Sequence, residues 1–105
     1  MMIDINVIYK ICSKDEWSVA LKKGVYKGSA DDLRDGFIHF STFNQVTNTL
    51  NKHYKGQKNL LILKVSTEHL FPSKLKWEIS RDNQKFPHLY GDLNLVAVIS
   101  INEIP

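Results

Sequence analysis

Two histidines, His39 and His88, are the residues of this 105-residue chain whose type and surroundings best fit acid–base chemistry. Each stands in an apolar stretch that ends in a turn or capping signal: residues 36–42 read GFIHFST, and residues 86–91 read FPHLYG. The unperturbed pKa of histidine lies closest to neutral pH, so an imidazole at the end of an element can exchange a proton there. One such histidine is more often structural, but the pair together favours a site.

Polar residues beside His39 extend this candidate site. Ser41 is two residues along the predicted strand, so it shares a sheet face with His39. Thr42 and Gln45 form a capping-box pattern that predicts the start of a helix, where backbone amides favour an anion or a polar ligand edge. We therefore expect His39, Ser41 and this helix start to converge, although simple capping by Thr42 explains the same pattern.

The second stretch supplies aromatic residues. Phe86 and Tyr90 could form a wall for a ring-shaped ligand, and Pro87 stiffens the loop between residues 81 and 87. Glu78 falls on an alternating strand and could face a cleft, but a surface ion pair with Arg81 is the commoner arrangement.

The other two histidines, His53 and His69, lie among lysine and polar residues, which is typical of a surface position. The histidines lack close ligand spacing and the chain has one cysteine, so no metal site is predicted.

Composition limits the class of protein. With 43% apolar and 24% charged residues, residues 1–105 predict one soluble globular domain. The lone Cys12 excludes an internal disulfide, suits a small buried side chain, and indicates a reducing compartment. A signal peptide and a membrane span are both absent from the pattern, so we expect a cytoplasmic location. The net charge of +3 comes from scattered lysines, compatible with a phosphorylated ligand but not with nucleic acid as the main partner.

The apolar patterns predict five main strands and two helices. Strands are expected at residues 7–12, 37–40, 60–65, 75–80 and 95–101, with the third and the last as central strands. Helices are expected after the caps Ser13 and Thr42, the first with Trp17, Ala20 and Leu21 on one apolar face. A short extended piece at residues 25–29 and a turn, or a single helical turn, at residues 30–35 complete the first half. Both helices lie in the N-terminal half, which indicates an α+β fold.

The chain resembles a family of small bacterial and plant proteins, domain-of-unknown-function family 952, from about residue 9 to residue 98. The residues that carry the likeness are Tyr9-Lys10-Ile11, Trp17, residues 24–29 (GVYKGS), residues 35–42 (DGFIHFST) with Gln45, Trp77-Glu78, and residues 86–91 (FPHLYG). The resemblance implies an ADP-ribosyltransferase-like fold, which is a split, curved β-sheet that grips NAD in a central cleft.

The same resemblance implies residue roles. Tyr9-Lys10 fall where poly-ADP-ribose polymerases place a histidine on the first strand, and His39 matches the tyrosine of a Gly-Ile-Tyr-Phe-Ala run. His88 is closest to the catalytic glutamate, with Glu78 as a more distant substitute. A neutral histidine lacks the negative charge of that glutamate, so the likeness implies nucleotide binding rather than polymerase-type transfer. Two histidines with Arg81 fit RNA 2′-phosphate transfer loosely, with histidine as proton donor or acceptor.

We therefore expect a cleft that binds NAD or a related nucleotide and acts at the ribose, with His39 and His88 as the catalytic pair. The residues expected to contact the nucleotide are Tyr9, Lys10, Ser41, Thr42, Gln45, Glu78, Arg81, Phe86 and Tyr90. Two alternatives stay open: a non-catalytic module that binds a nucleotide or another small ligand, and a histidine-based hydrolase of a small phosphorylated or glycosidic substrate.

Overall fold

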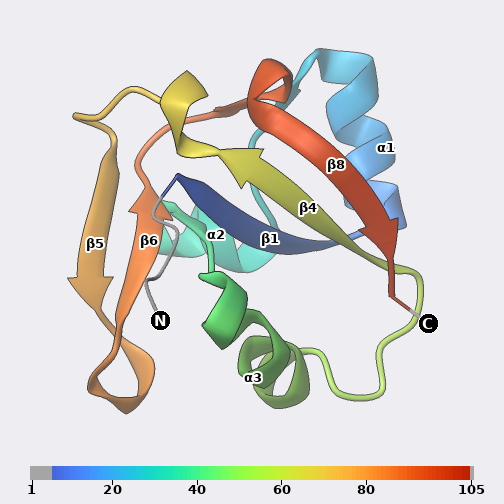
Figure 1. The fold of residues 1–105 in the computed structure, drawn as a ribbon. Helices are drawn as coiled ribbons and strands as arrows, with labels where there is room; N and C mark the ends of the chain where they lie inside the picture. Colours follow the sequence, from blue (N-terminus) through green and yellow to red (C-terminus); the bar gives the residue numbers. More distant parts are fainter. Residues whose placement is uncertain (1–5, 105) are drawn as a thin grey trace.

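The computed structural model describes residues 6–104, which form three α-helices, eight strands and three 3₁₀ turns (Figure 1). The helices are α1 (Lys14–Lys23), α2 (Ala30–Asp35) and α3 (Phe43–His53). The strands are β1 (Val7–Ser13), β2 (Val25–Tyr26), β3 (Ile38–His39), β4 (Leu60–Ser66), β5 (Leu75–Ile79), β6 (Lys85–Leu89), β7 (Leu93–Asn94) and β8 (Val98–Glu103). The 3₁₀ turns are η1 (Thr67–His69), η2 (Arg81–Asn83) and η3 (Leu95–Ala97).

These strands form small antiparallel sheets, so the α+β class is confirmed. One sheet has the order β1-β4-β8, a second has the order β3-β6-β5, and β2 pairs with β7. The two three-stranded sheets meet at a single bridge between Tyr9 and Ser41, whose backbones exchange two hydrogen bonds of 2.8 Å. The edge of β1 therefore lies next to the chain that follows β3.

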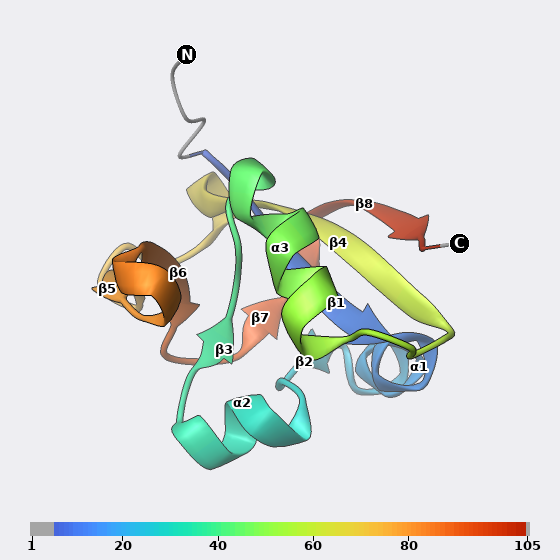
Figure 2. The same cartoon turned by 90° about the horizontal axis from the view of Figure 1, so that it is seen from below.

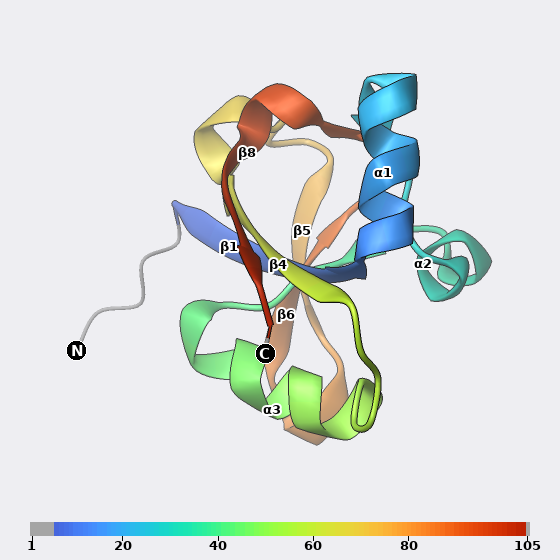
Figure 3. The ribbon, with the colours of Figure 1, turned by 90° about the vertical axis from the view of Figure 1, so that its right-hand side faces the viewer.

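The β1-β4-β8 sheet is covered on both sides. On one side Ile8, Cys12 and Leu63 belong to the main core with Trp17 and Ala20 of α1. On the other side Ile11 and Leu60 pack with Val46 of α3. Figure 3 shows α1 and α3 on different sides of this sheet. The prediction of a central strand at residues 60–65 is confirmed, because β4 lies between β1 and β8.

The helix starts follow the predicted capping patterns. The side chains of Ser13 and Glu16 cap α1 reciprocally, and Gln45 accepts a hydrogen bond from the Thr42 backbone N–H at the start of α3. The apolar face expected on α1 is narrower than predicted, since Leu21 is 59% exposed. Trp17 and Ala20, which are three residues apart, are the buried residues of α1, whereas Leu21 faces solvent.

Two expectations for the second half were wrong. Residues 81–87 were expected to form a loop, but β6 occupies residues 85–89 at the centre of its sheet. Proline normally excludes a central strand because it lacks an N–H. Here the Pro87 carbonyl accepts from the Phe40 N–H at the point where β3 has ended, so the missing N–H interrupts no ladder.

The last strand was expected to be central, but β8 is an edge strand. Its outer positions are open to solvent, with Ile99 56% and Ile101 45% exposed. Valine and isoleucine are common in edge strands as well as in central strands, so these residues could not show which position the last strand takes. Residues 95–97 form η3 rather than strand, because the Asn94 side chain accepts a hydrogen bond from Val96 N–H and caps that turn.

Two further expectations concern single features. The prediction that Cys12 is a buried side chain is confirmed, since it is 1% exposed. The turn expected at residues 30–35 is the six-residue helix α2, which ends at Gly36 in the left-handed region at φ 86°. Within residues 6–104, the helices are all too short or too polar to cross a membrane.

Candidate functional site

A cavity of about 430 Å³ lies beside the Tyr9–Ser41 bridge, between the edge of β1 and the paired strands β3 and β6. Residues of α2 line one flank of this cavity, and residues of α3 and η2 line the other. Figure 2 shows how the chain runs from α2 through β3 to α3. The cavity therefore opens where the two three-stranded sheets diverge.

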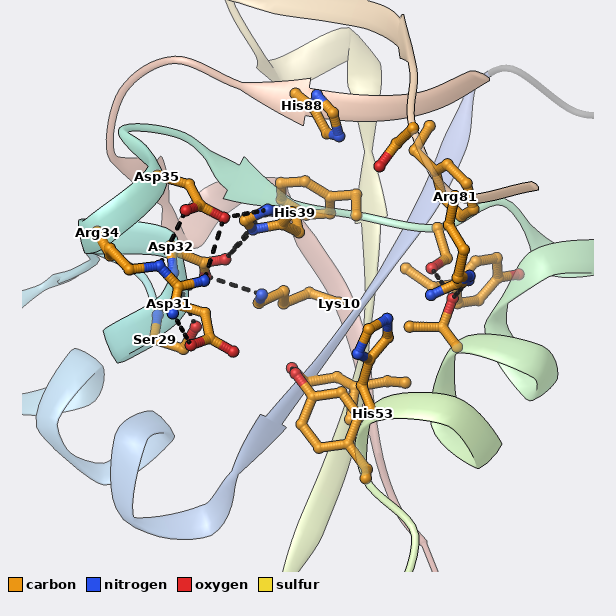
Figure 4. A pocket seen from close by; sticks show the side chains of 18 residues that line it. Lys10, Ser29, Asp31, Asp32, Arg34, Asp35, His39, His53, Arg81 and His88 are labelled. Carbon is orange, nitrogen blue, oxygen red and sulfur yellow. Dashed lines mark hydrogen bonds and ion pairs between the residues drawn. The ribbon is translucent and has the colours of Figure 1, made fainter. Parts of the chain in front are cut away.

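Both candidate histidines line this cavity. His39 and His88 are directly opposite each other in the β3–β6 ladder, and their ring centroids are 5.5 Å apart. The His39 side chain is 37% exposed and the His88 side chain only 5%. Figure 4 shows the His88 ring extending from β6 toward the space between His39 and Arg81. Two imidazoles that are distant in sequence thus share one pocket.

Both ring nitrogens of His39 face carboxylates. Nδ1 is 2.6 Å from Asp32 Oδ1, and Nε2 is 3.1 Å from Asp35 Oδ2. A neutral imidazole carries one N–H, so only the doubly protonated ring can donate to both carboxylates. The two carboxylates therefore hold the His39 ring from both of its nitrogens.

Asp32 is the centre of a buried charged network. Its Oδ2 forms an ion pair of 2.8 Å with Lys10 Nζ, and both side chains are nearly inaccessible, at 1% and 3% exposed. Burial alone would raise the pKa of Asp32, but the hydrogen bond from His39 and the nearby charge of Lys10 outweigh it, so the pKa lies below its usual value. Asp32 thus stays ionised and holds His39 in place.

Gly28 makes room for this carboxylate. The residue has φ 113°, and a Cβ atom placed on it would lie 2.7 Å from the Asp32 Cβ. Ser29, the next residue, caps α2 and donates its backbone N–H to Asp32 Oδ2. The stretch KGS at residues 27–29 therefore positions Asp32 as well as starting the helix.

His88 is held by a second carboxylate. Glu78 Oε1 is 2.9 Å from His88 Nδ1 and accepts a hydrogen bond of 2.7 Å from the Tyr90 hydroxyl. The hydrogen bonds from Tyr90 and His88 lower the pKa of Glu78. The Phe37 ring stacks on His88 with centroids 4.2 Å apart. In the neutral ring Nδ1 then carries the proton, and Nε2 is the acceptor.

Arg81 lies at the opposite end of the cavity from α2 (Figure 4). Its Nη2 donates to Thr49 Oγ1 at 2.8 Å, and the Thr49 hydroxyl is 3.0 Å from that of Ser41. The guanidinium also lies over the Phe86 ring, 4.9 Å from its centroid. Arg81 Nε is buried and has no hydrogen-bond partner among the residues described.

The structure brings together about half of the residues expected to contact a nucleotide. Tyr9, Lys10, Ser41, Arg81 and Phe86 line the cavity. Thr42, Gln45, Glu78 and Tyr90 lie outside the lining found for residues 6–104.

The helix start at Thr42 therefore does not converge with His39 on the pocket. Thr42 is 4% exposed, and its backbone N–H is bonded to Gln45 Oε1 at 3.0 Å. Gln45 in turn donates to the Lys85 carbonyl at 2.9 Å. These residues tie α3 to β6 instead of facing a ligand.

The ion pair expected between Glu78 and Arg81 is also wrong. Glu78 bonds to His88 and Tyr90, whereas Arg81 bonds to Thr49. Glu78 lies on β5, and Arg81 lies after the end of that strand, in η2. Side chains alternate between the two faces of a strand, and Glu78 lies on the face that carries His88.

Several lining residues escaped the sequence analysis. Asp32 and Asp35 fell in a stretch interpreted as a turn; the Ser29-x-x-Asp32 capping pattern was the signal for Asp32, and Asp35 begins the motif at residues 35–42. His53 was expected at the surface; its ring is exposed, but it also lines the cavity. Burial, together with the charge of Arg81, lowers the pKa of His53.

Comparison with known proteins gives a family and a fold but no activity. The model of a family described as "Protein of unknown function (DUF952)" matches residues 11–101. The crystal structure of protein CC0527 from Caulobacter crescentus is similar to this chain, with 44% identity, a TM-score of 0.90, and coverage of 94% of this chain and 86% of that one. The solution NMR structure of CC0527 is similar too, with 44% identity, a TM-score of 0.83, and coverage of 95% and 85%. Curated proteins gave no match.

Proposed function

Because the chain belongs to the DUF952 family, whose function is unknown, we propose its function from its own pocket: it binds NAD or a related nucleotide and acts at the ribose. The observation that carries this proposal is the pair of imidazoles, His39 and His88, each held by a carboxylate and both lining one cavity. The two rings have different partners and therefore different roles: His88 moves the proton, and His39 with Asp35 orients the ligand.

The size and setting of the cavity support a small ligand. Its volume of about 430 Å³ falls within the usual range for small-molecule sites. A pocket between diverging antiparallel sheets also agrees with the split sheet of the ADP-ribosyltransferase-like fold that the resemblance implies.

The proposed reaction is the hydrolysis or transfer of the ribose–nicotinamide bond. The oxygen of a water molecule, or of an acceptor hydroxyl, bonds to the anomeric carbon of the ribose, and His88 Nε2 takes the proton that this oxygen loses. The bond from that carbon to the nicotinamide nitrogen breaks, and its electron pair returns to the nicotinamide ring. Glu78 stabilises the imidazolium that forms on His88, a role for which it is placed at 2.9 Å.

His39 and Asp35 would orient the ribose. Asp35 is one-third exposed and faces His39 Nε2, so its carboxylate can also accept a hydrogen bond from a sugar hydroxyl. The ion pair of 3.0 Å with Arg34 fixes this carboxylate at the pocket wall.

A binding module without turnover is a second candidate. Both His39 nitrogens already face carboxylates, so this ring has no nitrogen that is free to exchange a proton with a ligand. In that case the pocket would hold the nucleotide, and His88 would serve as a hydrogen-bond acceptor only.

Nicotinamide release from NAD and the thermal shift of the protein, measured together, test the proposal. Turnover predicts release that His88→Gln reduces at least about 100-fold and that the surface control His69→Gln leaves unchanged. If His88→Gln does not fold, Glu78→Gln replaces it, with a smaller expected loss and a change in the pH profile. A thermal shift without release supports the binding module, and the absence of both overturns the proposal.

A further inference from the structure

The charges that line the cavity are distributed unevenly. Asp31, Asp32 and Asp35 all come from α2, on one flank. Arg81 comes from η2 and lies at the other end (Figure 4). The carboxylates of the α2 flank pair with Lys10 and Arg34, so this flank offers an anionic group no free cation, and Arg81 is the charged group left to attract it.

The other two cations of the lining are already neutralised. Lys10 forms its buried ion pair with Asp32 at 2.8 Å. Arg34 pairs with Asp31 at 3.1 Å and with Asp35 at 3.0 Å. Neither cation has a charge left over for a ligand.

Arg81 differs from both. Its ion-pair contact in residues 6–104 is with Asp82, at 3.9 Å, and Asp82 Oδ2 is itself bound by Lys52 Nζ at 2.8 Å. Lys52 thus satisfies the one carboxylate close to Arg81. Arg81 is the lining cation with uncompensated charge.

The guanidinium is also held ready for a ligand. The hydrogen bond to Thr49 and the contact with the Phe86 ring fix its position, and its Nε lies 3.9 Å from Asp82 Oδ2, too far for a hydrogen bond. Ser41 and Thr49, whose hydroxyls are 3.0 Å apart, and Ser80, the residue before Arg81, also line the cavity.

We propose that this end is a phosphate subsite that takes one phosphate group of the ligand, with Arg81 as the charged partner and a neighbouring hydroxyl as a further donor. A tetrahedral phosphate offers more acceptor directions than a carboxylate, which suits a guanidinium with a hydroxyl beside it. Because the phosphate lies toward Arg81, the ribose faces Asp35 and His39. This assignment rests on the proposed nucleotide pocket and adds the direction in which the nucleotide lies.

Binding without turnover tests the subsite. Inorganic phosphate, adenosine 5′-monophosphate and acetate are titrated separately while the Arg81 Nε–H signal is followed by NMR. We expect saturable binding of both phosphate probes, with much weaker binding of acetate. Arg81→Gln should weaken phosphate binding at least about tenfold, and Arg81→Lys should weaken it less, since lysine keeps the charge but not the fork.

Arg34→Gln is the matched control, since Arg34 is a lining cation of the same type that is paired with carboxylates. It should change phosphate affinity less than about threefold. Equal losses in Arg34→Gln and Arg81→Gln, acetate binding as tight as phosphate binding, or no saturable phosphate binding would each overturn the subsite. If Arg81→Gln does not fold, Arg81→Lys against Arg34→Lys gives the same comparison.

The two proposals fail in distinguishable ways. Phosphate binding that depends on Arg81, without release of nicotinamide, contradicts turnover and leaves the subsite standing. Nicotinamide release with an unchanged KM in Arg81→Gln contradicts the subsite and leaves turnover standing.

Discussion

Asp32 fixes His39 at two points: its Oδ1 accepts hydrogen bonds from the ring Nδ1 at 2.6 Å and from the backbone N–H of the same residue at 3.1 Å. The other carboxylate oxygen binds Lys10 and the Ser29 N–H. One buried side chain therefore joins β1, α2 and β3 at the wall of the pocket. The stability of the fold and the geometry of the site depend on the same group.

Replacing Asp32 by asparagine should be strongly destabilising. The change leaves the Lys10 ammonium buried without its counter-charge, which typically costs about 3–5 kcal/mol. Urea unfolding measures this loss. Asp92→Asn is the control, because Asp92 forms an exposed ion pair with Lys27 and should cost less than about 1 kcal/mol. Equal losses in the two variants would show that the buried pair contributes nothing special.

The pH dependence of stability should follow the lowered pKa of Asp32. The unfolded chain takes up a proton at this residue near pH 4, its ordinary pKa, whereas the native state does so only at lower pH. The contribution of Asp32 to the free energy of unfolding is therefore fully present above about pH 4, and it is lost as the pH falls toward the native pKa. Urea unfolding at several pH values measures this dependence, and the unfolding free energy should change less with pH in Asp32→Asn than in the wild type. Asp35 and Glu78, whose pKa values are also lowered, should leave some slope in that variant.

Gly28→Ala should disturb the pocket as well as the backbone. A Cβ at this position would lie 2.7 Å from the Asp32 Cβ, in addition to the strain of φ 113°. Gly56→Ala provides the comparison, since Gly56 also has a positive φ but nothing within 4 Å of its Cβ position. The Gly56 variant should lose about 1–2 kcal/mol from backbone strain alone. The Gly28 variant should lose more, and it should also shift the NMR signal of the His39 ring.

Cys12 should be unreactive in the native protein. Burial, and then the nearby charge of Glu16, raise the pKa of its thiol to about 12, so almost no thiolate exists at pH 8. A colourimetric thiol reagent should react with this single cysteine in urea but not in buffer. Rapid reaction of the folded protein would contradict the packing of β1 against α1.

Local patterns predicted the parts of the fold that depend on neighbouring residues. The capping boxes at Ser13 and Thr42 and the apolar run of β4 could be read because their partners lie within a few positions. The sequence did not predict β6, because a proline fits this central strand only where the neighbouring strand β3 has ended, and β3 is distant in sequence.

The candidate site shows the same division. The two histidines stood out by type, but the carboxylates that hold them did not. Asp32 serves both as a helix cap and as the partner of Lys10, which is 22 positions away, and only the second role belongs to the site. Glu78 reaches His88 because β5 and β6 are paired, a register that the sequence pattern did not contain.

The most direct test of a shared ligand pocket is an NMR titration with NAD that follows the ring Cε1–H signals of the histidines. His69 is exposed and lies outside the cavity lining in the described part of the chain, so it serves as an internal control. The signals of His39 and His88 should shift with one common midpoint while that of His69 stays constant. Different midpoints, a response from only one of the two rings, or no saturable response would contradict a single nucleotide pocket between them.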